Sequence, residues 1–94
     1  MYEDLERVLA DKAMIRGGLK LYRYDDAVSL VTLCDIHNIQ ILGIDAFFVA
    51  DGYTHPMMEH SIDLSNTETT QRNEVAYKFL ESKRNLELVF EIVY

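Results

Sequence analysis

The feature that most constrains the fold of this chain is its longest apolar run, residues 39–50 (IQILGIDAFFVA). The run is rich in β-branched and aromatic residues, which favour a β-strand. Both sets of alternating positions are apolar, as is typical of a central strand whose two faces are covered. Gly43 indicates a bulge, a bend or a close approach of another backbone. Asp45 would be half-buried, so we expect it either to bond nearby backbone amides or to contact a partner.

Hydrophobic periodicity predicts three helices: residues 3–16, a second from Asp25 or Asp26 to about residue 37, and residues 70–84. The Gly-Gly pair at 17–18 is expected to end the first helix, because glycine adopts the left-handed conformation at low cost. Residues 65–68 (SNTE) fit a capping box at the start of the third helix. The segment at 19–24 (LKLYRY) is ambiguous between a short strand and an extended connector, and we favour the connector.

Two further strands are expected after the apolar run. Asp51 and Gly52 are a strong signal for a hairpin turn, which places a return strand within residues 53–64. Pro56 lacks a backbone donor, so we expect the first half of that segment to be an edge strand or a loop, and residues 61–64 to be its paired part. Residues 86–94 (LELVFEIVY) alternate as a final strand.

These elements predict a single α+β domain, residues 1–94, with the order α-α-β-β-α-β. A strand–helix–strand unit returns parallel and within one sheet. A three-stranded sheet in the order 2-1-3, packed against the helices, would therefore place residues 39–50 in its centre. The alternative is a ferredoxin-like arrangement in which residues 19–24 form the first strand.

Composition and cysteine content indicate a soluble, folded protein, with 49% hydrophobic and 27% charged residues. The single cysteine, Cys34, cannot form an internal disulfide, which suits a reducing compartment. It lies on the apolar stripe of its helix, where we expect an inert thiol. The first residues lack the order of a signal peptide, and no apolar run approaches the roughly 20 residues of a membrane helix. We therefore expect a cytoplasmic protein that does not bind membranes.

The distribution of charge is more informative than the net charge of −7. Between Tyr24 and Gln71 there is no lysine or arginine, whereas the rest of the chain is close to neutral. Acidic fields repel phosphate backbones and steer association towards basic surfaces, so we expect a basic partner and no nucleic acid. The competing interpretation is that the charge serves only solubility. The lysine-free span contains eight acids: Asp25, Asp26, Asp35, Asp45, Asp51, Glu59, Asp63 and Glu68.

Tyrosine is also frequent, with six in the chain, and tyrosine is enriched at protein interfaces. Tyr22, Tyr24 and Tyr53 flank the acidic span. Ordinary half-buried tyrosines are an equally good interpretation of each one.

The sequence patterns that would indicate a metal site or a catalytic site are weak. His55, Glu59, His60 and Asp63 have metal-ligand side chains, but their spacing matches no zinc motif and we expect no metal or other cofactor. The candidate nucleophiles are in no recognised elbow motif, and no glycine-rich loop links a strand to a helix. We therefore expect no catalytic residues and no enzymatic activity. The candidate nucleophiles are Cys34, Ser61 and Ser65.

The segment ILGIDAFFVADGYTHPMMEHSIDLS, a following helix with AYKFL and the final LELVFEIVY strand resemble the small immunity proteins of bacterial polymorphic-toxin systems. In those proteins an I-L-G-x-[D/E]-x-F strand, an acidic x-D-[F/L]-S return and a terminal x-F-E-x-x strand recur. The resemblance covers the last half to two-thirds of the chain. The matching positions are Ile41, Leu42, Gly43, Asp45, Phe47, Asp63, Leu64, Ser65, Phe90 and Glu91.

The resemblance implies a non-enzymatic inhibitor that binds and neutralises a cognate bacterial toxin domain. The acidic span agrees, because nuclease toxins have basic clefts. We expect a monomer or weak homodimer. The alternative is a small regulatory or dimerisation domain, which would bind a ligand or metal at the histidine cluster or pair through its last strand as an exposed edge. The expected partner-binding residues are Asp45, Asp51, Tyr53, Glu59 and Asp63, with Asp25 and Asp26 as rim charges.

Overall fold

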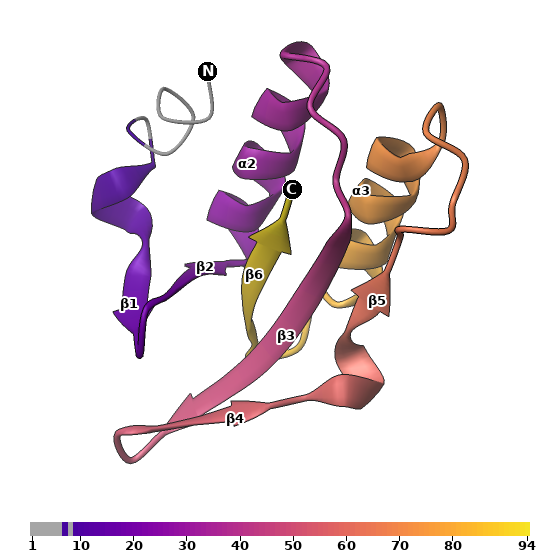
Figure 1. Ribbon diagram of the computed structural model, residues 1–94. Helices are drawn as coiled ribbons and strands as arrows, with labels where there is room; N and C mark the ends of the chain where they lie inside the picture. The colour runs from indigo at the N-terminus through magenta and orange to yellow at the C-terminus, as the bar shows by residue number, and fades with distance from the viewer. Residues whose placement is uncertain (1–6, 8) are drawn as a thin grey trace.

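The computed structural model of the chain describes Arg7 and residues 9–94 (Figure 1). Within these residues the chain forms two α-helices, α2 (Tyr24–Ile36) and α3 (Arg72–Ser82), and two short 3-10 turns, η1 (Ala10–Lys12) and η2 (Met58–His60). The strands are β1 (Met14–Arg16), β2 (Leu19–Arg23), β3 (Gly43–Ala50), β4 (Tyr53–Pro56), β5 (Ile62–Asp63) and β6 (Val89–Val93).

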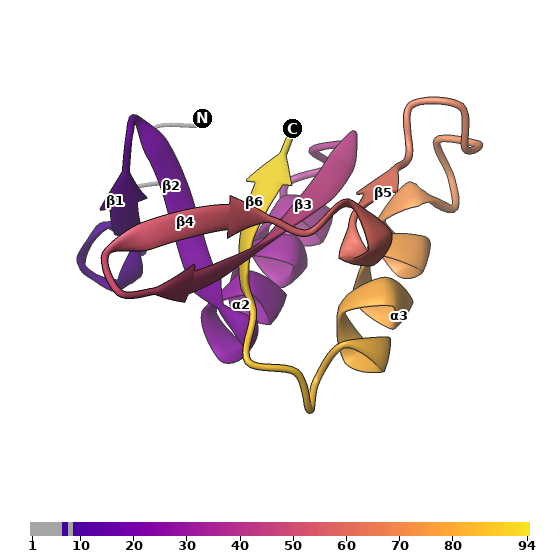
Figure 2. The same cartoon turned by 90° about the horizontal axis from the view of Figure 1, so that it is seen from below.

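The strands form one curled antiparallel sheet in the order β1-β2-β6-β3-β4, and β5 also pairs with β3. Both helices lie on the same face of this sheet (Figures 1 and 2). The α+β class is therefore confirmed, and β3 lies between β4 and β5 on one side and β6 on the other. The three-stranded sheet is wrong, because β2 and β1 extend the sheet beyond β6.

Two other expectations about the sheet, the ferredoxin-like arrangement and the last strand as an exposed edge, are also wrong. From β2 onwards, with β4 and β5 counted as one broken return strand, the elements follow a β-α-β-β-α-β order, but a ferredoxin-like sheet has its first and third strands in the centre. Here β6 and β3, the last and the second strands of that series, are central. The last strand is accordingly no exposed edge: β6 pairs with β2 on one side and with β3 on the other.

Two tight turns each join a pair of neighbouring antiparallel strands. The turn at Asp51 and Gly52 was expected, whereas the turn at Gly17 and Gly18 joins two strands that the sequence analysis did not predict. Gly17 and Gly18, with φ of 55° and 86°, form the turn between β1 and β2, so they do not end a helix. Asp51 and Gly52, with φ of 53° and 79°, form the turn between β3 and β4. Two successive positive φ values are typical of hairpin turns whose twist matches the strands. Residues 19–23 are therefore a strand, not a connector. Over residues 10–16, η1 and β1 replace the helix expected over 3–16, whereas Arg7 is helical and residues 1–6 and 8 lie outside the described part.

The helix ends differ from those expected. α2 ends at Ile36, and Asn38 just beyond its C-cap adopts a left-handed φ of 58°. The capping box at 65–68 is wrong, because α3 begins at Arg72 and its N-cap is Gln71, with no side-chain bond. The preceding loop is held by Arg72 instead, whose Nε and Nη2 donate to the carbonyl oxygens of Thr67 and Ser65, both at 2.8 Å.

The return strand is broken into β4 and β5. The backbone amide of Ala46, at the break, donates to Ser61 Oγ at 2.9 Å, and that hydroxyl donates to the carbonyl oxygen of Met57 at 3.0 Å. Pro56 does not exclude its segment from the sheet, because β4 is an edge strand and a missing donor is tolerated there. A Cβ on Gly43 would lie 3.0 Å from the Ile62 carbonyl oxygen, so the expected close backbone approach is confirmed.

The curled sheet buries residues on both faces. The main core lies between the sheet and the helices and includes Leu30, Ile44, Leu80 and Phe90, each at most 1% exposed. A second, smaller cluster lies on the face of the sheet opposite α2 and α3. We call this the helix-free face, because it carries no α-helix within the described residues. β3 contributes to both, which accounts for its apolar character at odd and even positions. The second cluster is formed by Leu21, Phe47 and Val89, packed with Met14, Leu19 and Val49.

Candidate partner-binding surface

The helix-free face of the sheet carries three carboxylates on neighbouring strands. Asp45 of β3 pairs directly with Glu91 of β6, and Gly43, two residues before Asp45, pairs with Asp63 of β5. Directly paired residues and residues two apart on a strand point to the same face. We call Asp45, Asp63 and Glu91 the acidic sheet face.

The Asp45–Glu91 pair is electrostatically unfavourable when both groups are charged. Partial burial raises the pKa of Glu91, and the neighbouring charge of Asp45 and a hydrogen bond with it raise the pKa further. Cross-strand partners have Cβ atoms only about 4.5–5.5 Å apart, and like charges there are destabilising. The structure places the carboxyl group of Asp45 against that of Glu91 across the strands, an interaction that neither expected role of Asp45 included.

Asp63 differs, because its carboxylate has a local partner. Its Oδ1 accepts a hydrogen bond from the backbone amide of Ser65 at 2.9 Å, and the bonds from Ser65 lower the pKa of Asp63. The side chain therefore shapes the turn that follows β5.

Apolar surface adjoins the acidic sheet face. Phe47 is two residues from Asp45 on β3 and pairs with Val89, which is two residues from Glu91 on β6. Both belong to the second cluster and are at most 9% exposed. They belong to the protein's own core, and a more exposed apolar side chain on the same face is Val93, two residues after Glu91 and 36% exposed.

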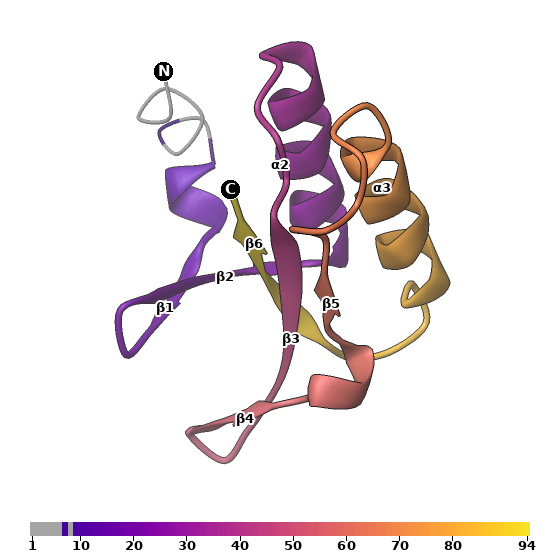
Figure 3. The same ribbon diagram turned by 45° about the vertical axis from the view of Figure 1, so that its right-hand side comes forward.

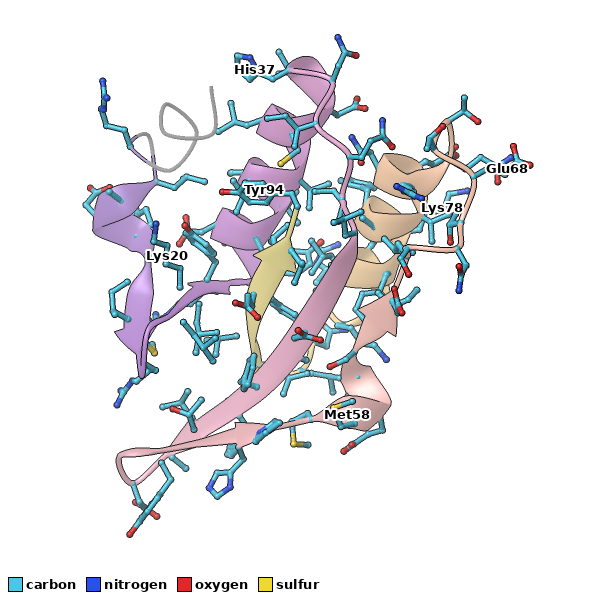
Figure 4. All side chains as sticks on the ribbon, in the orientation of Figure 1. Lys20, His37, Met58, Glu68, Lys78 and Tyr94 are labelled. Atoms are coloured by element: carbon cyan, nitrogen blue, oxygen red, sulfur yellow. The ribbon has the colours of Figure 1, made fainter. Side chains whose placement is uncertain are left out.

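The β3–β4 hairpin carries a second group of expected binding residues. Its tip extends away from the helices (Figure 1), with Asp51 in the turn and Tyr53 at the start of β4. Tyr53 is 68% exposed, and its ring lies 6.2 Å from that of His55. Glu59 follows in η2 beside Met58, which is 75% exposed and is labelled in Figure 4.

The remaining acids and tyrosines singled out in the sequence do not adjoin the acidic sheet face or the β3–β4 hairpin. Asp25 and Asp26 are in the first turn of α2, on the helical side of the sheet. Glu68 is in the loop before α3, at a distance from Met58 and the hairpin in Figure 4. Tyr22 is 3% exposed within the main core, so it is not available to a partner. The lysine-free span therefore does not form one continuous acidic side.

Glu91 was the residue that the sequence analysis left out of the site. It lies outside the lysine-free span, and only the register of β6 against β3 brings it opposite Asp45. The alternation of LELVFEIVY placed Glu87 and Glu91 on one face of a strand, but it did not identify the neighbouring strand.

The histidine cluster is dispersed. His55 is exposed on β4, and His60 Nδ1 lies 3.2 Å from Lys83 Nζ on the segment after α3. Within the part of the chain that the structure describes, no three His, Cys, Asp or Glu side chains are placed to hold a metal ion. The alternative hypothesis of a metal-dependent domain therefore lacks its expected site.

Two of the candidate nucleophiles, Cys34 and Ser61, have surroundings that indicate a structural role. Cys34 is buried in the main core, and burial raises its pKa to about 11, so little thiolate forms at neutral pH. Ser61 Oγ forms hydrogen bonds with the backbone of Ala46 and Met57 at the break in the return strand.

Neither helix within the described residues has the length and apolar character that crossing a bilayer requires.

Comparisons of the chain with protein-family models, curated proteins and solved structures find no match.

Proposed function

We propose that this protein is a non-enzymatic inhibitor that binds a basic protein domain through the acidic sheet face. The observation that carries the proposal is the pairing of Asp45 with Glu91 in the centre of the sheet face opposite α2 and α3. An isolated acid on a surface serves solubility, but two opposed carboxyl groups raise the free energy of the unbound protein. A partner that places a cation between them removes this cost.

Arginine fits this site best. Its planar guanidinium donates several N–H bonds and can reach two carboxylates at once. Val93, two residues after Glu91 on the same face of β6 and 36% exposed, provides apolar surface for the stem of the arginine. Asp51, Tyr53 and Glu59 of the hairpin region extend the contact, whereas Asp25 and Asp26 act only as long-range steering charges.

A toxin domain with a basic substrate cleft is the partner that the charge and the resemblance to immunity proteins both favour. Such a protein acts in the cytoplasm of the cell that it protects. The inhibition is stoichiometric, because the site supplies complementary charge and surface and no reactive group.

Co-expression tests the proposal. The C-terminal domain of the protein encoded immediately upstream is expressed in cells with and without this chain, and survival is compared. The double variant Asp45→Asn/Glu91→Gln keeps the shape of the face and removes both charges. We expect loss of protection and an affinity roughly 30–100-fold weaker, as for removal of a buried interfacial charge.

The matched control is Asp25→Asn/Asp26→Asn, which makes the same change in net charge on the helical side. We expect it to protect cells and to bind within about threefold of the unmodified protein. Equal behaviour of the two doubles would show that only net charge matters, and an upstream domain that neither binds nor harms cells would reject the inhibitor.

A further inference from the structure

The free edge of β4 is a feature of the fold that the proposed function does not use. β4 is the last strand in the sheet order, and it pairs with β3 along one side. In Figures 1 and 3 it lies at the bottom of the molecule, and no other described element lies below it. An edge of this kind presents backbone N–H and C=O groups to any strand that can lie beside it.

The register of β4 against β3 decides which backbone groups point to the free edge. Continuing that register, the amide of Met57 donates to the carbonyl oxygen of Ala46 at 2.8 Å. Hydrogen-bonded and non-bonded pairs alternate along an antiparallel ladder, so His55 also bonds to β3, whereas Thr54 and Pro56 direct their backbone groups away from it. Proline has no N–H, so Thr54 is the residue of β4 with both a donor and an acceptor on the free edge.

A second copy of the chain fits this edge in one register. Two antiparallel β4 strands related by a two-fold axis place Thr54 opposite Thr54 of the other copy, and each amide then donates to the carbonyl oxygen of the other. With Thr54 opposite Pro56, the proline ring would meet a carbonyl oxygen that needs a donor. With Pro56 opposite Pro56, neither strand would supply a donor.

The side chains beside Thr54 suit this register. Tyr53 is 68% exposed, and its ring lies 6.2 Å from that of His55 on the same strand. In the Thr54 register, Tyr53 of each copy is directly opposite His55 of the other, so the two pairs of rings meet across the axis. Cross-strand pairs of aromatic residues and of threonines both stabilise antiparallel sheets.

The charges near the two edge strands favour self-pairing of β4 over that of β1. β4 has the sequence YTHP, without the lysine or other charged side chain that commonly protects an edge strand. The nearest acid in the chain, Asp51, would lie six positions from Asp51 of the other copy, which is roughly 20 Å along a strand and exceeds the Debye length of about 8 Å at 0.15 M salt. In β1 the equivalent register is centred on Ile15, and it would bring Arg16 to within two positions, or roughly 7 Å, of its counterpart. Repulsion therefore opposes the pairing of two β1 strands much more than that of two β4 strands.

We propose that β4 pairs with β4 of a second copy through Thr54, which forms a weak, two-fold symmetric dimer with a continuous sheet. The contact is much smaller than a standard protein interface, so we expect a Kd on the order of 1 mM. The proposal goes beyond the inhibitor function and does not depend on it. Tyr53 belongs to both contacts, so a protein partner bound at the hairpin would displace the second copy.

Sedimentation equilibrium and ¹H–¹⁵N NMR of the full chain, at concentrations up to about 2 mM, test the dimer. We expect the average mass to rise with concentration and the amide signals of residues 52–57 to shift. In the Thr54 register, Tyr53 and His55 of different copies form a non-hydrogen-bonded pair with Cα atoms about 4.5 Å apart. A mixture of isotope-labelled and unlabelled chains should therefore give an intermolecular Hα–Hα NOE between these two residues. A chain that remains monomeric, or shifts confined to other elements, would overturn the proposal.

Substitutions at one position separate the backbone donor from the side chain. Thr54→Pro removes the donor from the free edge without removing a bond to β3, and it should weaken the dimer about tenfold or more. Thr54→Val keeps the donor and the strand preference, so it should change the Kd less than about threefold. Unchanged dimerisation of a folded Thr54→Pro variant would place the contact elsewhere and reject the β4 pair.

A second matched pair applies if Thr54→Pro does not fold. Tyr53→Ser removes a ring from the proposed contact, and Tyr77→Ser removes a ring that is 43% exposed on α3. We expect the first variant to weaken the dimer about tenfold and the second to leave it unchanged. Equal Kd values of the two variants would contradict pairing through β4.

Discussion

At the scale of single residues, Asp45 and Glu91 are the positions whose properties depend most on their neighbours. Each is an ordinary acid in the sequence, and each lies on a strand with apolar residues on both sides. Their direct pairing across β3 and β6 raises the pKa of Glu91 through burial and through the charge of Asp45. The proposed binding surface therefore lowers the stability of the unbound protein, as is common at binding sites.

The raised pKa makes a prediction about pH. The folded protein retains a proton on Glu91 at pH values where the unfolded chain, with a pKa near 4.5, has lost it. The contribution to stability is complete below that value and is lost as the pH rises through the folded pKa. Glu91→Gln removes this loss, so we expect the variant to match the unmodified protein near pH 4 and to exceed its stability by about 0.2–1 kcal/mol at pH 7.

Urea denaturation at pH 4 to 7.5 measures this difference. Glu87→Gln, in the exposed segment before β6, is the control and should show no such trend. Asp63, whose pKa is lowered, gives the opposite pH dependence, but it does so in all three proteins and cancels in the comparison. A difference that is constant with pH would contradict the assigned pairing.

At the scale of elements, the two hairpins show how the same turn geometry is achieved by different residues. Gly17-Gly18 joins β1 to β2, and Asp51-Gly52 joins β3 to β4, in each case with two positive φ values. A Cβ added at Gly52 would meet nothing within 4 Å, so only the backbone conformation requires glycine there. Aspartate tolerates the left-handed conformation at the first position, because short polar side chains bond locally.

Substitutions in the β3–β4 turn separate its conformation from its charge. Gly52→Ala should lower the free energy of unfolding by about 1 kcal/mol, since alanine pays for a positive φ that glycine adopts freely. Asp51→Asn should change stability by less than about 0.5 kcal/mol, because asparagine is favoured in such turns. Midpoints of urea denaturation at a constant slope test both. Equal stability of Gly52→Ala and the unmodified protein would show that the turn relaxes.

At the scale of the whole molecule, the chain carries a net charge of −7 within a body whose longest extent is 39 Å. The acids of the lysine-free span are spread over the hairpin, the helix-free face and the helical side, so they repel one another across the molecule. Such self-repulsion disfavours the compact state. In the proposed function, the whole surface steers a basic partner, whereas the contact itself belongs to the acidic sheet face.

Salt dependence tests this distribution of charge. Raising NaCl from 10 to 150 mM shortens the Debye length from about 30 to about 8 Å, so long-range repulsion is screened. We expect the free energy of unfolding to rise by on the order of 1 kcal/mol. The variant Asp51→Asn/Glu59→Gln/Glu68→Gln, which reduces the net charge from −7 by three to −4, should show a smaller rise. A fall in stability with salt would indicate that ion pairs outweigh repulsion.

The sequence correctly indicated the elements whose signals are local. The period of residues 25–37 gave α2, Asp51-Gly52 gave the β3–β4 turn, and the two-sided apolar run gave a central strand. The errors arose where one local signal has two meanings. Gly17-Gly18 suits a helix end and a hairpin turn equally, and choosing the helix end removed β1 and β2 from the sheet. The capping box failed similarly, because Asp63 and Arg72 bind that loop instead.

The sequence by itself therefore determined the class of the fold, the centre of the sheet and the sign of the surface charge, since periodicity, turn chemistry and charge are carried by neighbouring residues. Only the tertiary structure decided which carboxylates meet. Strand register is set by the packing of β6 between β2 and β3, and a shift by one residue would move Glu91 to the opposite face. The pairing of residues 46 positions apart in the chain is a property of that packing, and no local pattern encodes it.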